Sequence, residues 1–418
     1  MSKKTIKVIM LILILNILFN NPVLAMNAAT PAAEKLAEFT DNFFREKLAR
    51  HNVPGVAIVI VKDGKIIFSK GYGYANIETK RPVDPKESIF RAASVSKIFT
   101  IVGTLQLAEQ GLIDIDEDVN RYITSFKVEN CYEEPVRIRH LLTHTDGFET
   151  RDLATFIKEP KELETLEEIL KKNLKSPVQK PGSMITYGGY GTALAGYLIT
   201  QIQNVPFEEY IEENIFKPLN MENSTFNQNL PNHLKDKVVT TYNYEENEAK
   251  FTPTEFLFVR TPPTGALSTT AEDMGRFLIA LLNNGKFKDI RIINESTAEM
   301  ILNRQYSTHP YLPGVTYGFM EHFSNGQRGL VRDGSGVGVR SQIFLLPEHN
   351  LGYFYVQNTR GDELIEEFNK AFLDEFFPRD NDIFTAVTSA ADLKKYEGNY
   401  RPAQTPEHTL VKMEKPWP

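Results

Sequence analysis

Ser94 and Lys97 are the residues of this sequence best suited to nucleophilic catalysis. They form a Ser-x-x-Lys motif, and the apolar pattern of an amphipathic helix follows them. Residues three apart share one face of a helix, so the Lys97 amine can reach the Ser94 hydroxyl. If burial lowers the pKa of Lys97, its neutral amine can take the serine proton. The N–H groups at the helix start favour an oxyanion beside the serine.

Ser94 alone could simply be a helix N-cap. A tyrosine supports a catalytic role for Ser94 and Lys97 instead. Tyr187 follows the Pro-Gly turn at 181–182 and precedes a helix expected to begin near Gly191. At such a junction the phenol can project into a cleft, where the charge of Lys97 would stabilise its phenolate. The alternative for Tyr187 is an aromatic side chain packed beneath the loop.

A third candidate segment precedes a predicted C-terminal hairpin and reads Arg332-Asp333-Gly334-Ser335. Its small residues let a substrate approach an edge strand closely, and its cation can bind a carboxylate or a phosphate. Taken alone, the segment is equally typical of a glycine-rich bulge or turn. A functional role for this segment is favoured because the serine, the lysine and the tyrosine occur in the same chain.

The order of the three elements resembles the serine β-lactamase and penicillin-binding-protein-like family, especially its class C branch with the related esterases and D-amino-acid peptidases. The similarity runs from about Gly55 to Asn358 and includes the segments 71–75, 138–147, 216–221 and 265–271. In that family the Ser-x-x-Lys serine forms an acyl-enzyme. The lysine and the tyrosine of a Tyr-x-Asn motif move protons, and a Lys/His-x-Gly strand helps to bind the substrate.

The resemblance implies that Ser94 becomes acylated, with Lys97 and Tyr187 as general bases. It implies an oxyanion hole made by the backbone N–H groups of Ser94 and Ser335. Substrate contacts would come from the third segment, namely Arg332, Asp333, Gly334 and Ser335. The implied substrates are D-Ala-type peptides of the cell wall, esters or β-lactams, and neither a cofactor nor a metal ion is expected.

Two departures from the family pattern concern the substrate. Gly189 stands where the family usually has the asparagine of Tyr-x-Asn, so the side-chain amide that contacts a substrate amide is absent. This counts against efficient β-lactam hydrolysis. Arg332 replaces lysine or histidine, and its guanidinium suits an anionic substrate group better than proton transfer. Gly189 also supports an alternative, a penicillin-recognising or cell-wall-binding protein with little catalysis, although the intact serine, lysine and tyrosine favour the hydrolase.

Other reactive residues favour structural roles. His140 and His144 have the spacing of two metal ligands on a helix, but the glutamate of a metalloprotease does not accompany them. We therefore expect a structural pair that braces a loop. A Ser-His-Asp triad using His144 and Asp146 lacks a Gly-x-Ser-x-Gly elbow. Cys131 is the only cysteine, and we expect a passive thiol.

Two hairpins and a helical region between them must position the candidate residues. Strands are expected at 56–61 and 65–70, joined at Asp63-Gly64, and at 341–346 and 351–357. Helices are expected at 31–50, 96–110, 163–172, 192–203, 207–216 and 271–283. This order predicts an α+β fold, an α/β/α sandwich in which helices flank an antiparallel sheet.

The two ends of the sequence differ from its middle. Three lysines precede an apolar run from Val8 to Phe19, which predicts a signal peptide over 1–25, with an uncleaved membrane anchor as the alternative. We expect one hydrolase domain over 30–378. Residues 385–418 form a tail that resembles the start of a small β-barrel but is too short to complete one.

The amino-acid composition limits the classes of binding partner that we expect. Acidic residues outnumber basic ones 54 to 47, and no basic patch with aromatic residues is present, so we do not expect nucleic-acid binding. The predicted signal peptide indicates a secreted or extracytoplasmic protein, with peripheral association with the membrane or the cell wall as a further expectation. No particular oligomeric state is predicted.

Overall fold

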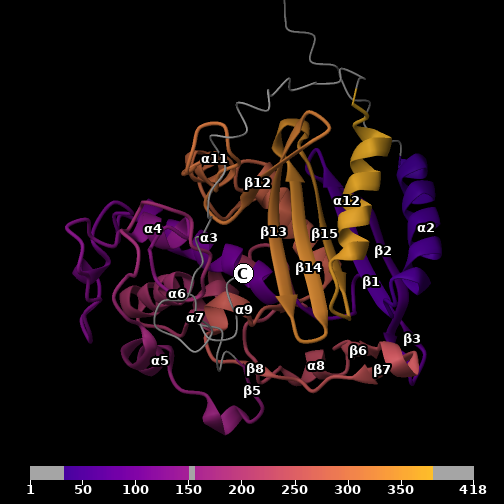
Figure 1. Cartoon of the computed structure of the whole chain (residues 1–418), viewed down its shortest axis with the longest axis horizontal. Helices are drawn as coiled ribbons and strands as arrows, with labels where there is room; N and C mark the ends of the chain where they lie inside the picture. Colours follow the sequence, from indigo (N-terminus) through magenta and orange to yellow (C-terminus); the bar gives the residue numbers. More distant parts are fainter. Residues whose placement is uncertain (1–32, 150–155, 380–418) are drawn as a thin grey trace, which may run out of the picture.

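A seven-stranded antiparallel sheet runs through the centre of the fold (Figure 1). The computed structural model describes residues 33–149 and 156–379, and the predicted signal peptide (1–25) and tail (385–418) lie outside them. The strand order is β12-β13-β14-β15-β1-β2-β3. These strands are β1 (Gly55–Lys62), β2 (Lys65–Asn76), β3 (Arg81–Pro82), β12 (Met320–Ser324), β13 (Gln327–Gly336), β14 (Val339–Leu346) and β15 (Leu351–Gln357).

Both predicted hairpins are present. The first turns at Asp63 and Gly64, which have φ of 49° and 74°, the left-handed backbone that a tight two-residue turn between twisted strands requires. The second hairpin joins β14 to β15. Because β15 also pairs with β1, segments far apart in the sequence meet in the middle of the sheet.

Helices α2 (Ala33–Arg50) and α12 (Glu363–Phe376) cover one face of the sheet. Their aromatic side chains form a cluster in which Phe44 stacks on Phe368, with ring centroids 5.3 Å apart. Alternate β1 residues such as Ile58 join this cluster, whereas Val59 belongs to the core on the other face. Successive strand side chains point to opposite faces, so a central strand buried on both sides is apolar throughout. Helix α12 was not predicted from the sequence.

The opposite face of the sheet packs against α10 (Ala271–Leu282). Gly275 allows this close packing, because a Cβ there would lie 2.8 Å from a methyl group of Val59. Helix α3 (Ser96–Glu109) belongs to the core on this face of the sheet and is almost entirely buried. The predicted α/β/α sandwich is therefore confirmed.

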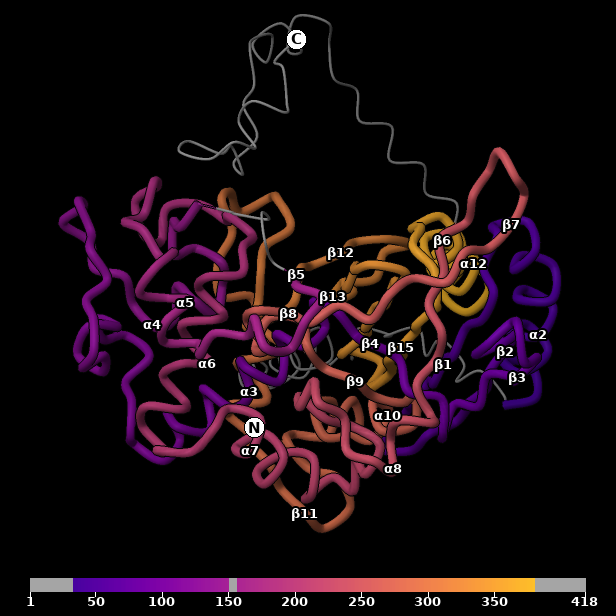
Figure 2. Tube along the Cα trace, turned by 90° about the horizontal axis from the view of Figure 1, so that it is seen from below, coloured from indigo at the N-terminus to yellow at the C-terminus, as the bar shows by residue number. Residues whose placement is uncertain are grey.

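The largely helical region lies beside the sheet, and Figure 2 shows α4, α5 and α6 on the side away from α2 and α12. It contains α4 (Ile138–Leu142), α5 (Leu166–Asn173), α6 (Tyr190–Gln203), α7 (Phe207–Ile211), α8 (Asn232–Lys235) and α9 (Pro262–Gly265), and α11 (Glu295–Leu302) follows α10. The helix predicted over 207–216 is interrupted, because α7 continues as a π-helical turn, Glu212–Phe216. This turn places Phe216 in the core against Phe99. No helix among the described residues is long and apolar enough to cross a membrane.

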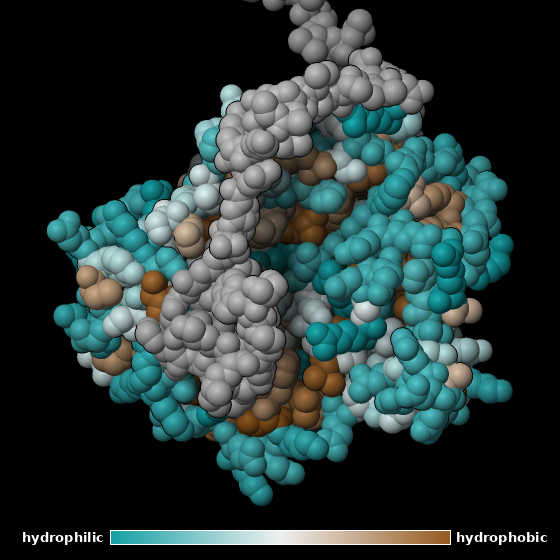
Figure 3. Space-filling model, viewed as in Figure 1, coloured by the Kyte–Doolittle hydropathy of each residue, from teal (hydrophilic) through white to brown (hydrophobic). Residues whose placement is uncertain are grey.

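Short strand pairs that the sequence analysis did not predict tie this region together. They are β4 (Phe90–Arg91) with β9 (Ser268–Thr269), β5 (Phe156–Ile157) with β8 (Phe258–Val259), β6 (Tyr242–Glu245) with β7 (Lys250–Pro253), and β10 (Lys286–Phe287) with β11 (Ile290–Arg291). Figure 3 shows apolar side chains reaching the surface between the helical region and the sheet.

Candidate active site

Ser94 lies in a tight 3₁₀ turn, Ala93–Val95, immediately before α3. Ala93 has a φ of 45°, a left-handed conformation that costs on the order of 1–3 kcal/mol in a residue with a side chain. Ser96 braces the turn, because its hydroxyl donates to the Ala93 carbonyl (2.5 Å) and accepts from the Leu267 N–H (3.0 Å). No side chain caps α3, so Ser94 does not serve as its N-cap.

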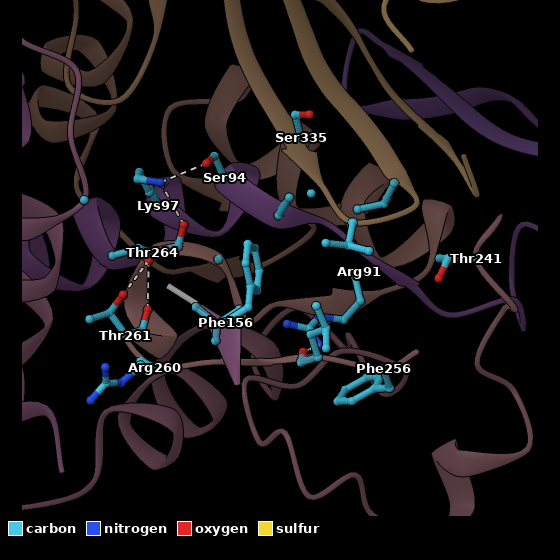
Figure 4. Close-up of a pocket in the computed structure, with 18 of the residues that line it drawn as sticks. Arg91, Ser94, Lys97, Phe156, Thr241, Phe256, Arg260, Thr261, Thr264 and Ser335 are labelled. Atoms are coloured by element: carbon cyan, nitrogen blue, oxygen red, sulfur yellow. Dashed lines mark hydrogen bonds between the residues drawn. The ribbon is translucent and has the colours of Figure 1, made fainter. Parts of the chain in front are cut away.

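Lys97 reaches Ser94 as the spacing predicts. Its Nζ lies 2.9 Å from Ser94 Oγ and 2.8 Å from the carbonyl oxygen of Thr264 in α9 (Figure 4). The Lys97 side chain is buried at 4% exposure, so both contacts form away from bulk water. The first turn of α3 and the short helix α9 together fix the amine beside the serine.

Tyr187 completes the group. Lys97 Nζ lies 5.3 Å from the centre of the Tyr187 ring. Burial by itself raises the pKa of Tyr187, but the charges of Arg332 and Lys97 and the hydrogen bonds of Ser94 and Lys97 outweigh it, lowering that pKa from 10.0 to about 7. The predicted set of Ser94, Lys97 and Tyr187 is therefore brought together, with a phenol that is partly ionised at neutral pH.

Arg332 contacts this group from β13 and is only 2% exposed. Its Nε donates to the Ser94 carbonyl (3.1 Å), its Nη1 lies 3.3 Å from His144 Nε2, and its Nη2 lies 3.5 Å from the Tyr187 oxygen. The guanidinium is thus occupied by the site itself. This geometry favours a positioning and electrostatic role, in place of the direct contact with a substrate anion that the sequence suggested.

His144, expected from the sequence only as one of a structural pair with His140, contacts the candidate active site. Its ring centroid lies 4.6 Å from that of Tyr187, and its backbone has a φ of 54°. Burial, with the charges of Arg332 and Lys97, holds the pKa of His144 well below 6.5. A neutral ring can accept from Arg332 through Nε2. His140, by contrast, accepts the Arg137 N–H at 3.1 Å, so the two histidines do not act as the expected pair.

Strand β13 passes directly alongside the serine turn. A Cβ on Gly334 would collide with the Ala92 carbonyl oxygen and would lie 3.2 Å from the Ser94 nitrogen. Ser341 of β14 fixes the same turn, because its hydroxyl donates to the Ala92 carbonyl at 2.7 Å. Only glycine at 334 permits this approach, and the next residue, Ser335, lines the cavity together with Ser94.

The Asp333 side chain bonds to neighbouring strand residues and is not among the residues that line the cavity. Its Oδ1 accepts from Arg340 Nη2 (2.7 Å) and from Gln342 Nε2 (2.9 Å). Because strand side chains alternate, Asp333 points to the face opposite Arg332. The substrate contact expected for its carboxylate is therefore not retained.

A cavity of about 760 Å³ opens over the serine (Figure 4). Gly189 lies in its wall, where a Cβ would meet only a Thr264 methyl group at 4.0 Å, so the place of the missing asparagine is open space. Other parts of the wall are apolar and include Phe156, Ile169, Phe256, Leu257, Val259 and Val337. The arrangement combines a nucleophile, a tyrosine of lowered pKa and a partly apolar cavity, which is what acyl transfer requires.

Comparisons with known proteins agree with this geometry. A family model described as Beta-lactamase matches residues 40–374. Protein flp of Staphylococcus aureus (strain MW2) is 25% identical over 336 residues, covering 79% of this chain and 65% of that protein. Beta-lactamase-like protein 4 of Dictyostelium discoideum is 29% identical over 342 residues, covering 75% and 58%. The chain thus spans less than two thirds of the length of these relatives.

A solved structure is similar over most of its length. The octameric penicillin-binding protein homologue from Pyrococcus abyssi superposes with a TM-score of 0.70 and 27% sequence identity, covering 82% of this chain and 78% of that one. The likeness therefore extends across the sheet and the helical region together.

Proposed function

Because the chain belongs to the beta-lactamase family and has its β-lactamase/transpeptidase-like fold, we propose that it is a serine hydrolase acting through an acyl-enzyme on Ser94. One observation carries the proposal. Lys97 Nζ lies 2.9 Å from Ser94 Oγ, and the same two residues hydrogen-bond to Tyr187 inside one cavity. A protein that only binds ligands has no need of all three groups together.

The proposed first step is attack of Ser94 Oγ on the carbonyl carbon of the substrate. The phenolate of Tyr187 takes the serine proton, while the positive charges of Lys97 and Arg332 stabilise that phenolate beforehand. The protonated phenol then passes the proton to the leaving group as its bond to the carbonyl carbon breaks. Water attacks the resulting ester, and Tyr187 takes a proton from it as the base. The phenol returns this proton to Ser94 Oγ as the ester bond breaks, so that the acid leaves and Ser94 is restored.

Charge on the substrate oxygen must be stabilised during both steps. We propose the backbone N–H groups of Ser94 and Ser335 as the oxyanion hole. The close approach of β13 at Gly334 supports this assignment, because it sets the two backbone segments side by side. Fixed amides stabilise such a charge without having to reorient.

The proposed substrates are simple esters, ahead of D-Ala-type peptides and β-lactams, which both carry an amide. The open space at Gly189 supports this order, since no side-chain amide is present there to hold a substrate amide. The same feature supports a second candidate, a penicillin-recognising or cell-wall-binding protein with little catalysis.

Intact-protein mass spectrometry tests the proposal. The full chain and Ser94→Ala are incubated with a fluorescent penicillin and with an activated ester, and both adducts and product release are measured. Ser324→Ala, on β12, is the matched control. Hydrolysis of the ester that requires Ser94 supports the hydrolase. An adduct without turnover supports the penicillin-recognising protein, and the absence of any Ser94-dependent adduct or turnover contradicts the hydrolase.

A further inference from the structure

Arg91 lies on β4, three residues before Ser94, and lines the same cavity. Its Nη1 donates to the Leu257 carbonyl at 3.1 Å, and its guanidinium carbon lies 4.7 Å from the centre of the Phe256 ring. Figure 4 shows Arg91 next to Phe256, on the side of the cavity away from Lys97. These two contacts fix the plane of the guanidinium relative to the cavity wall.

Among the described residues, no carboxylate pairs with Arg91. Its Nε is enclosed without a hydrogen-bond partner there. Its Nη2 has no hydrogen bond within the described ranges and is not enclosed, so this donor remains open to the cavity. Burial lowers the pKa of Arg91 to about 10, which still leaves the side chain positively charged at neutral pH.

No other charged residue described on the cavity wall neutralises the positive charge of Arg91. Arg260 forms an ion pair with Glu164, and Glu255 lies 2.6 Å from Lys158 in another. Glu255, the one carboxylate among the described residues of the wall, is therefore already paired. Arg360, which also lines the cavity, adds a further positive charge at its exposed rim.

A partly buried cation without a counter-ion destabilises a protein unless an anion reaches it. Arginine is suited to carboxylates, because its planar donors match the two carboxylate oxygens and their charge strengthens the hydrogen bonds. The ring of Phe256 covers one face of the guanidinium, which favours approach along its Nη2 edge.

We propose that Arg91 binds a carboxylate carried by the acyl donor, so that the enzyme prefers anionic substrates to neutral ones. This inference rests on the proposed serine hydrolase function and specifies its substrate class. The carboxylate can belong to the acyl group or to the leaving group, and recognition by Arg91 is the same in both cases.

Two matched pairs of esters test the proposal and separate these sources. Para-nitrophenyl hydrogen glutarate against para-nitrophenyl pentanoate places the carboxylate on the acyl group. Meta-acetoxybenzoate against meta-acetoxybenzamide places it on the leaving group. For the full chain, Arg91→Gln should lower kcat/KM for the anionic member of one pair by about ten- to a hundredfold and for the neutral member by less than about threefold. Arg91→Lys should retain part of the preference.

Arg360→Gln is the control for the general field of the cavity, because it removes a charge of the same sign from the rim. Equal losses for anionic and neutral esters in Arg91→Gln, no loss for any, or an equal anionic loss in Arg360→Gln would each overturn the proposal. Thermal unfolding of Arg91→Gln and Arg91→Met shows whether the loss of the hydrogen bond to the Leu257 carbonyl destabilises the fold and so explains a loss of activity. Failure of the wild type to hydrolyse even the neutral esters through Ser94 would instead refute the proposed function.

Discussion

Arg332 Nη2 lies 3.5 Å from the phenol oxygen of Tyr187, while Nε of the same guanidinium holds the backbone carbonyl of Ser94. One permanently charged side chain therefore both positions the nucleophile's turn and stabilises the base. Arginine cannot take up or release a proton near neutral pH, so its influence on Tyr187 is constant across the working range.

The pH dependence of hydrolysis should report this relationship. With a Tyr187 pKa of about 7, kcat/KM for a neutral ester should rise with pH through about 7 and then level off. Arg332→Gln removes a positive charge, raises the pKa of Tyr187 and should move this rise to higher pH by about one unit or more. Arg328→Gln, on the same strand, should leave it in place. An unmoved rise in Arg332→Gln would exclude Tyr187 as the titrating base.

Removal of the phenol oxygen should lower the rate strongly. General-base catalysis contributes about 10²–10⁴-fold, so Tyr187→Phe should lose that much kcat/KM with an activated ester. Tyr197→Phe is the control, because that buried phenol bonds to Ser125 and Glu167 away from the cavity. Retention of more than about a tenth of the activity in Tyr187→Phe would assign the proton transfer to Lys97 alone.

Gly334→Ala should damage the site and the fold together. The new methyl group would meet the Ala92 carbonyl and the Ser341 hydroxyl, so β13 must move away from Ser94. Overpacking of this kind costs about 1–3 kcal/mol, which a thermal melt can detect. At Gly265 a Cβ would lie 3.8 Å from its nearest neighbour, and Gly265→Ala should melt close to the wild type. Wild-type stability and activity in Gly334→Ala would show that the two backbones are not held together.

Gly189→Asn should improve recognition of substrate amides. Gly189 is the N-cap of α6, a position that asparagine fills well, and a Cβ there has room. We expect the rate of Ser94 acylation by a fluorescent penicillin to rise by about tenfold or more. Gly189→Ala is the control that adds a side chain without an amide. An equal acylation rate in both variants would show that the amide group is not responsible for the gain.

Stability should fall with rising pH because of Asp146. Burial raises the pKa of this carboxyl from 3.8 to about 7, although it accepts the Phe148 N–H at 2.9 Å. Between these two values the folded state holds a proton that the unfolded state releases, so the free energy of unfolding decreases as pH rises, by on the order of 2–4 kcal/mol in all.

The Asp146→Asn variant checks this in urea titrations at pH 4 and pH 8. The amide keeps the Phe148 hydrogen bond but carries no titrating proton, so the variant should lose less stability over this interval than the wild type. Asp118→Asn, at a partly exposed carboxylate that accepts from Asn120, is the control. A pH dependence equal to that of the wild type in Asp146→Asn would contradict the prediction.

Local sequence rules were sufficient for part of this structure. The Asp63-Gly64 turn fixes the first hairpin, and the spacing of Ser94 and Lys97 places both on one helical turn. Contacts between distant segments could not be predicted in this way. His144 and Arg332 meet across 188 positions, and Lys97 and Thr264 across 167, so no periodicity relates them.

The same limit explains the roles that changed. From the sequence, Arg332 was simply a cation next to glycines, and only the fold shows that its donors are already used by the site. Arg91 was not singled out from the sequence, and neither was the short strand β4 that carries it. Its isolation from every described carboxylate depends on segments more than 150 positions away, such as the one that carries Leu257.

The pairing of β1 with β15 has a consequence for synthesis on the ribosome. The serine turn emerges early, but β13 and β14, which hold Arg332 and Ser341 against it, come more than two hundred residues later. A nascent chain that ends before β13 therefore contains Ser94 and Lys97 but neither Arg332 nor Ser341, which fix the serine turn in the folded protein. We therefore expect hydrolytic activity to appear only after β13 and β14 have been synthesised, and an incomplete nascent chain to be inactive.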